Sequence, residues 1–309
     1  MKTLKLLPAA VILGLSGLAQ AGYVELGAEY EDFNSSHNHN DFVMPYLATG
    51  FTPVADLPLH FAFKFSDKQA TRTSTDATSG REFSNDRSRQ EYIVWYDYDV
   101  TDKFTFSPRL NIRHNEYSQT NTHDTEWRIH PNMTYAYSDM VTLALDGFVA
   151  PVTAKSVSRG NDTGNLNNYT DYLHELDFQV RTQLNESQAF RASIYSEYKK
   201  TSNTTLASEA DTMEEWQLRL IYSHQFDRFS ISPFARLNLK RDFKNAVGEK
   251  KDQARNRYGV FGDYLLTSNM NVVYEAYYQS EEQKNYQNES LEIGDQDKMF
   301  YKLGLRYNF

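Results

Sequence analysis

The chain has 309 residues, with 22 tyrosines, 19 phenylalanines, no cysteine and a formal net charge of −9. An acidic chain repels the phosphates of DNA and RNA, so it is a poor candidate for binding nucleic acid. The lack of cysteine excludes a disulfide framework, a thiolate nucleophile and cysteine-ligated zinc. Its aromatic content of 14% argues against a disordered chain, and its length admits one large domain or two ordinary ones.

The first 21 residues have the pattern of a bacterial secretory signal peptide. Lys2 and Lys5 give a basic start, residues 6–18 are mostly apolar, and Ala19-Gln20-Ala21 matches the small-x-small motif that signal peptidase accepts. The apolar stretch is too short to span a bilayer comfortably as a helix. We therefore expect a signal peptide over 1–21 and one exported domain over 22–309.

Apolar and polar residues alternate almost throughout residues 22–309. Val24, Leu26, Ala28 and Tyr30, for example, are each separated by one residue that is charged or glycine. A period of two is the pattern of a β-strand with one polar and one apolar face. Fourteen segments show it: 23–32, 41–49, 58–67, 88–99, 103–116, 125–137, 140–153, 169–184, 189–200, 213–225, 229–242, 256–265, 269–282 and 297–309.

The connections between these segments alternate between short ones, rich in Asp, Asn and Ser, and long polar ones. Such alternation is typical of an up-and-down meander with turns in the periplasm and loops outside the cell. Most segments run to about ten residues or more, which is enough for a tilted strand to cross a bilayer. The strands of soluble β-sandwiches average only about five or six residues. The sequence thus predicts an all-β fold, a 14-stranded antiparallel up-and-down transmembrane β-barrel.

Aromatic residues and the last residue indicate the bacterial outer membrane. Tyr98 and Phe226 lie beside short connections, whereas Trp127 and Tyr258 lie towards long ones, as expected of aromatic girdles at two membrane interfaces. The chain ends at Phe309, which resembles the terminal aromatic signature that the barrel assembly machinery reads. We expect membrane lipid and this machinery to be its partners.

If the apolar positions of each strand face lipid, the alternate positions face the inside of the barrel, and these carry charges of both signs. Opposed charges order water and orient solutes in a lumen, although they can also form salt-bridge ladders that only stiffen the wall. The same alternation turns Lys240 inward. The predicted pore-lining residues are Glu25, Glu29, Arg109, Arg113, Arg128, Glu175, Arg181, Arg191, Arg219, Arg236, Arg257, Glu275 and Arg306.

Enzyme signatures are absent from the sequence. No GxSxG nucleophile motif, HExxH or other metal-spaced cluster occurs. His123 and Asp124 are adjacent in a polar connection, where such residues are usually solvated. We therefore expect no catalytic residue, no metal site and no cofactor.

Short strings along the chain resemble a known porin family. They are Trp127-Arg128-Ile129-His130-Pro131, Ile231-Ser232-Pro233-Phe234-Ala235-Arg236, Asn256-Arg257-Tyr258-Gly259-Val260-Phe261, Tyr274-Glu275-Ala276-Tyr277, and Asp297-Lys298-Met299-Phe300-Tyr301 with Tyr307-Asn308-Phe309. The family is that of outer membrane protein G, a fourteen-stranded monomeric porin for mono- and oligosaccharides. The resemblance implies that Arg128, Arg236, Arg257 and Glu275 lie in a pore wall. It also implies passive diffusion of sugars and small ions.

A channel for acidic oligosaccharides and a barrel enzyme or adhesin stay open as alternatives at this point. An arginine-lined channel specific for acidic oligosaccharides would need a more uniformly basic lumen than this mixed one. A barrel enzyme or an adhesin would place its function at the rim or in larger loops. A trimeric porin needs a long third loop folded into the pore, and connection 117–124 is too short for that, so we expect a monomer.

Overall fold

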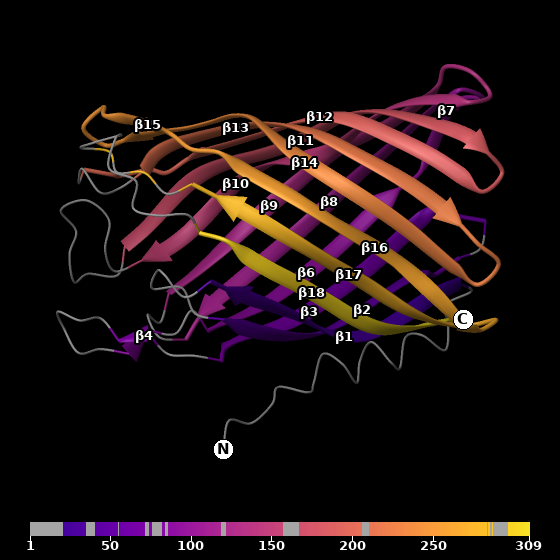
Figure 1. Cartoon of the computed structure of the whole chain (residues 1–309), viewed down its shortest axis with the longest axis horizontal. Helices are drawn as coiled ribbons and strands as arrows, with labels where there is room; N and C mark the ends of the chain where they lie inside the picture. The colour runs from indigo at the N-terminus through magenta and orange to yellow at the C-terminus, as the bar shows by residue number, and fades with distance from the viewer. Residues whose placement is uncertain are drawn as a thin grey trace.

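The computed structural model describes residues 21–34, 41–54, 56–71, 74–75, 82–83, 86–118, 122–156, 167–205, 210–282, 284, 286 and 296–309. The signal peptide expected over 1–21 lies outside these residues except for Ala21. Fourteen long strands form the barrel (Figure 1): β1 (Ala21–Phe33), β2 (Phe42–Thr52), β3 (Leu59–Ala70), β6 (Arg87–Tyr96), β8 (Phe104–Tyr117), β9 (Thr122–Ala136), β10 (Val141–Ser156), β11 (Asn167–Asn185), β12 (Gln188–Lys200), β13 (Ala210–Gln225), β14 (Phe229–Asn245), β16 (Arg255–Thr267), β17 (Met270–Glu281) and β18 (Lys298–Asn308).

Four shorter strands accompany the barrel. β7 (Tyr98–Thr101) follows β6 and pairs with β8, and β15 (Lys250–Asp252) pairs back on the end of β14. β4 (Ser74–Thr75) and β5 (Glu82–Phe83) form a separate two-stranded sheet.

Each barrel strand pairs antiparallel with the strand before it and the strand after it in the chain. The ring closes where the first strand meets the last, with Glu25 opposite Arg306 and Tyr30 opposite Tyr301. Closure satisfies the backbone groups that an open sheet would leave at its edges. The prediction of a fourteen-stranded antiparallel meander is confirmed.

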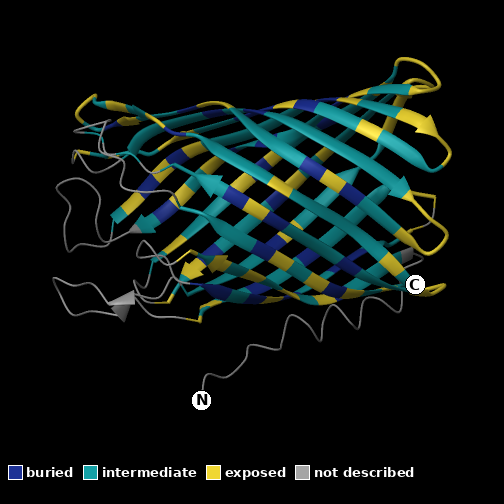
Figure 2. Cartoon of the chain, viewed as in Figure 1, coloured by how far each residue is buried: buried dark blue, intermediate teal, exposed yellow. Residues whose placement is uncertain are grey.

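The alternation in the sequence becomes an alternation of exposure along each strand. Leu303 and Leu26 are 63% and 59% exposed, whereas Glu25, next to Leu26, is 3% exposed. Figure 2 shows the result as a checkered pattern along the strands, with exposed positions between less exposed ones. Large apolar side chains on the outside and charged ones on the inside suit a barrel that is surrounded by lipid.

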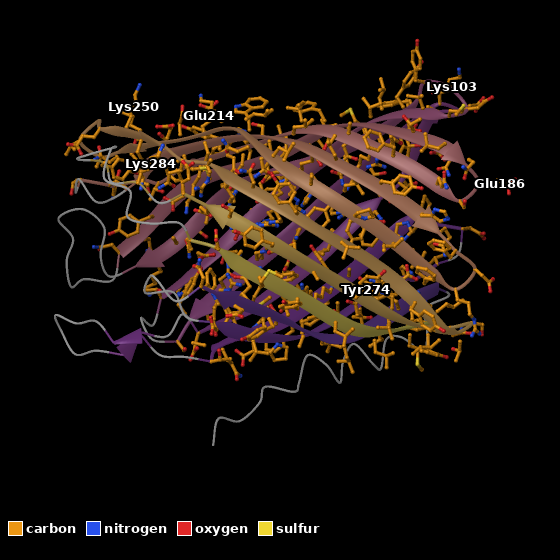
Figure 3. All side chains as sticks on the ribbon, viewed as in Figure 1. Lys103, Glu186, Glu214, Lys250, Tyr274 and Lys284 are labelled. Atoms are coloured by element: carbon orange, nitrogen blue, oxygen red, sulfur yellow. The ribbon has the colours of Figure 1, made fainter. Side chains whose placement is uncertain are left out.

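The two ends of the barrel differ. Tight turns gather at one end, where Figure 3 labels Lys103 and Glu186. Asn185 builds one of these turns, because its side-chain oxygen accepts a hydrogen bond of 3.0 Å from the backbone N–H of Ser187. Lys250 and Lys284 lie at the other end, on longer connections. In outer-membrane barrels short turns face the periplasm and long loops face outward, so the second end is the extracellular one.

Gly147 in β10 permits a close approach of two neighbouring strands. Its backbone φ is +122°, and a Cβ atom there would lie 2.1 Å from the carbonyl oxygen of Glu175 in β11. Gly248, in the connection between β14 and β15, also has a positive φ, +92°, but a Cβ there would meet nothing within 4 Å.

We predict that Gly147→Ala destabilises the barrel by about 2 kcal/mol or more, because a left-handed backbone and a steric clash both oppose the added methyl group. Gly248→Ala is the matched control and carries only the backbone cost of about 1 kcal/mol. Urea unfolding of the refolded barrel, followed by its heat-modifiable shift in electrophoresis, measures both. Equal destabilisation would show that the contact with Glu175 does not matter.

Candidate pore wall

Contacts between strands that are not neighbours identify the inner face of the barrel. Arg255 in β16 lies 3.4 Å from Glu197 in β12, although β13 and β14 separate the two strands. Lys64 in β3 lies 3.3 Å from Glu29 in β1, across β2. Such side chains can meet only on the concave side of a closed sheet. The face that carries these charges is therefore the inside.

The strand register extends this face to the residues predicted from the sequence. On the inside, Glu25 is opposite Arg306, and Glu175 is opposite Glu197. Successive inward positions follow at every second residue. All thirteen predicted residues lie on the inner face: Glu25, Glu29, Arg109, Arg113, Arg128, Glu175, Arg181, Arg191, Arg219, Arg236, Arg257, Glu275 and Arg306.

One ion cluster ties the first strand to the last. The carboxylate of Glu25 accepts hydrogen bonds from the Arg306 guanidinium at 2.6 Å and from the Tyr46 hydroxyl at 2.6 Å, and Lys302 lies 3.3 Å away. Glu25 is only 3% exposed, so its charge needs these partners. The predicted charges of this cluster stabilise the wall, because they link β1 to β18, the two strands at which the ring closes.

A second cluster crosses β6, β8 and β9. Arg113 lies 3.2 Å from Glu91 and 3.8 Å from Glu126, and Arg128 donates to Glu126 at 2.6 Å. Asn111 donates to Glu91 at 3.1 Å. The sequence predicts Arg113 and Arg128 as pore-lining residues, but it does not single out Glu126, the acid that joins them.

A third cluster near the extracellular end was missed from the sequence. Glu215 in β13 is fully buried, and its carboxylate accepts hydrogen bonds from Arg241 at 3.2 Å and from Arg255 at 3.1 Å. Arg241 also lies 2.9 Å from Glu281 in β17. The cluster therefore links β13, β14, β16 and β17 across the inside of the barrel.

The sequence misses Arg241 in this cluster because β14 does not alternate strictly, and it misses Arg255 because the predicted segment begins one residue later, at 256. Gln217 is opposite Asn238 but its neighbour Trp216 is opposite Lys240, so Leu239 is an extra residue in a β-bulge. The bulge turns Arg241 inward and Lys240 outward, where Lys240 pairs with Glu214 at 2.7 Å. The predicted inward position of Lys240 is wrong for this reason. The alternation of residues before a bulge does not indicate that a bulge follows. Only the structure therefore shows that the inward positions of β14 move from even to odd residue numbers after Leu239.

The connection between β14 and β16 is folded onto the extracellular end. Gln253 accepts a hydrogen bond of 3.0 Å from Arg241, and the Lys251 ammonium donates to the backbone oxygen of Lys284 at 2.8 Å. Burial, and then the positive charge of Arg241, lower the pKa of Lys251 below its usual range. The third cluster therefore also fixes this connection to the rim.

Within the described ranges, no group of three histidine, aspartate or glutamate residues is placed to hold a metal ion. No helix in that part of the chain is long and apolar enough to cross a membrane.

Solved structures of outer-membrane channels share this fold. The CymD monoaromatic hydrocarbon channel superposes with a TM-score of 0.52 at 8% identity, over 95% of this chain and 90% of that one. The toluene transporter TodX of Pseudomonas putida gives a TM-score of 0.50 at 11% identity, over 95% and 91% of the two chains. At such low identities the likeness shows the fold alone. No protein-family model and no curated protein matches the chain.

These comparisons contradict the resemblance to outer membrane protein G. The two barrels described above, which share the fold over nearly the whole chain, are hydrocarbon channels, a different kind of outer-membrane barrel. The short strings that suggested the porin family lie almost wholly within barrel strands, and strings of this length do not identify one family among barrels that share a fold, so the assignment to outer membrane protein G is wrong.

We predict that Glu215→Gln destabilises the barrel by about 3 kcal/mol, because Arg241 and Arg255 would keep buried charges without their shared carboxylate. Glu214→Gln is the control, since the neighbouring residue has an exposed partner, Lys240, and its loss should cost less than about 1 kcal/mol. Unfolding in urea, read from electrophoretic mobility, compares the two. If both substitutions cost the same, Glu215 does not hold the cluster together.

The closed ring of strands, the apolar outer face and the fold shared with outer-membrane channels lead to one conclusion: the chain is an integral β-barrel of the bacterial outer membrane.

Proposed function

We propose that this barrel is a monomeric channel through which hydrophilic solutes, including mono- and oligosaccharides and small ions, diffuse passively. The observation that carries the proposal is the inner face itself, which presents charged groups of both signs from most of the barrel strands. A hydrated solute keeps such groups solvated. An apolar solute would strip water from them at a high cost in free energy.

Barrel size supports an open passage. Eight strands give an interior that side chains just fill, and barrels of sixteen to eighteen strands hold an aqueous channel. Fourteen strands lie between these cases and nearer to the second. Transport needs no chemical step in this account, because the fixed charges replace part of the water around a passing solute. We assign the barrel no enzymatic role and no cofactor.

The short connection between β8 and β9 favours a monomer, because a trimeric porin needs a long loop here that folds into the pore. Only residues 118–121 separate these strands, too few to fold into the lumen and narrow it. The apolar outer face supplies the contact with membrane lipid. The carboxyl-terminal Phe309, whose backbone pairs with Gly22 at 2.9 and 3.0 Å, is the residue we assign to recognition by the assembly machinery.

A second candidate function is the passage of small apolar or aromatic molecules. One observation favours it: Phe234, Tyr277 and Phe300 form an apolar cluster on the inner face. Two of the proteins that share the fold are a monoaromatic hydrocarbon channel and a toluene transporter. The three rings are at most 8% exposed, however, so a passing hydrocarbon would find little free apolar surface. We therefore rank this candidate second.

Single-channel recording in a planar bilayer tests the two candidates. We predict one large conductance step without triplet behaviour, proportional to salt concentration and briefly interrupted by neutral oligosaccharides. Toluene should leave the current unchanged, because the rings inside the barrel are covered. A folded, heat-modifiable barrel that conducts no ions contradicts the channel proposal. Saturable block by toluene, with no effect of sugars, would favour the second candidate instead.

A further inference from the structure

Three arginines face the lumen side by side at one level of the wall. Arg219 in β13 is opposite Arg236 in β14, and Arg236 is opposite Arg257 in β16. We call these three residues the arginine row. Like charges directly opposite each other on paired strands destabilise a sheet. The row is therefore costly to the fold unless an opposite charge neutralises it.

The wall neutralises this row only in part. Among the residues that the structure describes, neither Arg236 nor Arg257 forms an ion pair, and Arg219 reaches Asp177 at 3.9 Å. Glu275 attracts Arg236 and Arg257 electrostatically without pairing with either. In contrast, Arg306 lies 2.6 Å from its carboxylate partner. The row keeps a positive charge that the described wall leaves unmatched.

The aromatic side chains of Phe234 and Tyr277, which we call the aromatic shelf, lie beside the arginine row. At the next level of the wall, Ile221 is opposite Phe234, Phe234 opposite Gly259, Gly259 opposite Tyr277, and Tyr277 opposite Phe300. A Cβ atom on Gly259 would lie 2.5 Å from the Cβ of Tyr277 and 2.8 Å from a ring carbon of Phe234. Only glycine at this position lets the two rings approach each other.

The rings hold the guanidinium groups in place. The Arg257 guanidinium carbon lies 4.2 Å from the Tyr277 ring centre, that of Arg236 5.4 Å from Phe234, and that of Arg219 3.3 Å from Tyr195. Phe234 and Tyr277 are 7% and 6% exposed, so the shelf is covered rather than open. Part of the guanidinium edge is already used: Arg257 donates through Nε and Nη2 to the side-chain oxygen of Gln279 at 3.1 and 2.6 Å, and Arg219 donates through Nε to that of Gln217 at 3.1 Å. Because the rings pack on the faces of the guanidinium groups, the remaining N–H groups stay available for an acceptor.

We propose that Arg219, Arg236 and Arg257 form a binding site inside the lumen for solutes that carry a carboxylate on a hydroxylated body, such as sugar acids. The proposal rests on the channel function proposed above. Guanidinium groups bind carboxylates through two parallel N–H···O bonds, and a bound carboxylate would supply the charge that the row lacks. Phe234 and Tyr277 are positioning residues, because they orient the arginines and do not contact the solute.

Galacturonate and galactose are the matched probes, since they share one ring and differ by a carboxylate at carbon 6. Each is added to the conducting wild-type barrel in a planar bilayer, and the concentration that halves the mean current is measured. We expect this concentration to be about tenfold lower for galacturonate, since a hydrogen bond to a charged group adds roughly 1.5 kcal/mol or more. Inorganic phosphate is the third probe, and half-block at a lower concentration than galacturonate would overturn the assignment to carboxylates.

Single substitutions locate the site. Arg236→Gln and Arg257→Gln should each raise the half-blocking concentration of galacturonate by about fivefold or more, since each removes a charged donor pair. Arg109→Gln is the control. Arg109 faces the same lumen from β8, forms no ion pair among the described residues and packs 5.2 Å from the Trp95 ring centre, so its loss changes the lumen charge equally. It should change the half-blocking concentration by less than about twofold.

A conducting barrel that galactose and galacturonate block equally would overturn the site, and so would an Arg109→Gln barrel that loses as much affinity as Arg236→Gln. A barrel that folds but never conducts contradicts the channel proposal rather than the site.

Tyr277→Leu tests the positioning role with no change of charge. It should raise the half-blocking concentration of galacturonate about threefold while the conductance in salt stays the same, and Tyr277→Phe should behave as wild type. If galacturonate blocks the Tyr277→Leu barrel at the same concentration as the wild-type barrel, the aromatic shelf does not position the arginines.

Discussion

The hydrocarbon core of a membrane offers no water to the backbone, so each N–H and C=O group of a spanning strand must pair within the protein. In this chain the requirement is met by closing fourteen strands into a ring. The seam runs between β1 and β18, from Tyr23 opposite Asn308 to Phe33 opposite Lys298. The Glu25–Arg306 pair strengthens that seam from the inside. Every other feature of the barrel follows from the closed ring, because closure divides the side chains into an outer and an inner set.

The inner set brings many charges into a confined space, and most of them are used to hold the wall together. Glu215 alone joins Arg241 and Arg255 from two other strands, and Glu126 joins Arg113 and Arg128. The arginine row differs, because Arg236 and Arg257 form no ion pair among the described residues and the aromatic neighbours orient the row without neutralising it. The same wall therefore combines self-satisfied clusters, which fix the shape of the barrel, with a row that can interact with a passing solute.

Strand positions and the direction of the charged side chains could be predicted because the side-chain period of a strand is strict. Alternation around Glu25, Arg128 and Arg306 is enough to place these residues on the inner face. The bulge at Leu239 breaks that period, so alternation alone puts Lys240 on the wrong side and overlooks Arg241. The partners of Glu215 come from strands far apart in the sequence, which no local pattern contains. Short strings within strands do not identify a family, since barrels only 8% and 11% identical to this chain share its fold.

If the charged face lines a water-filled passage, its side chains are accessible to a charged reagent, and the natural absence of cysteine allows a direct measurement of that access. Glu275→Cys would place one thiol on the inner face of β17, and Ala276→Cys would place one on the outer face, next to it in the chain. A charged, membrane-impermeant thiol reagent is added to each conducting barrel in a bilayer. We expect rapid labelling and a lasting fall in current for Glu275→Cys only. An unreactive Glu275→Cys barrel, or labelling of Ala276→Cys with the same fall in current, would contradict a water-filled passage lined by the charged face.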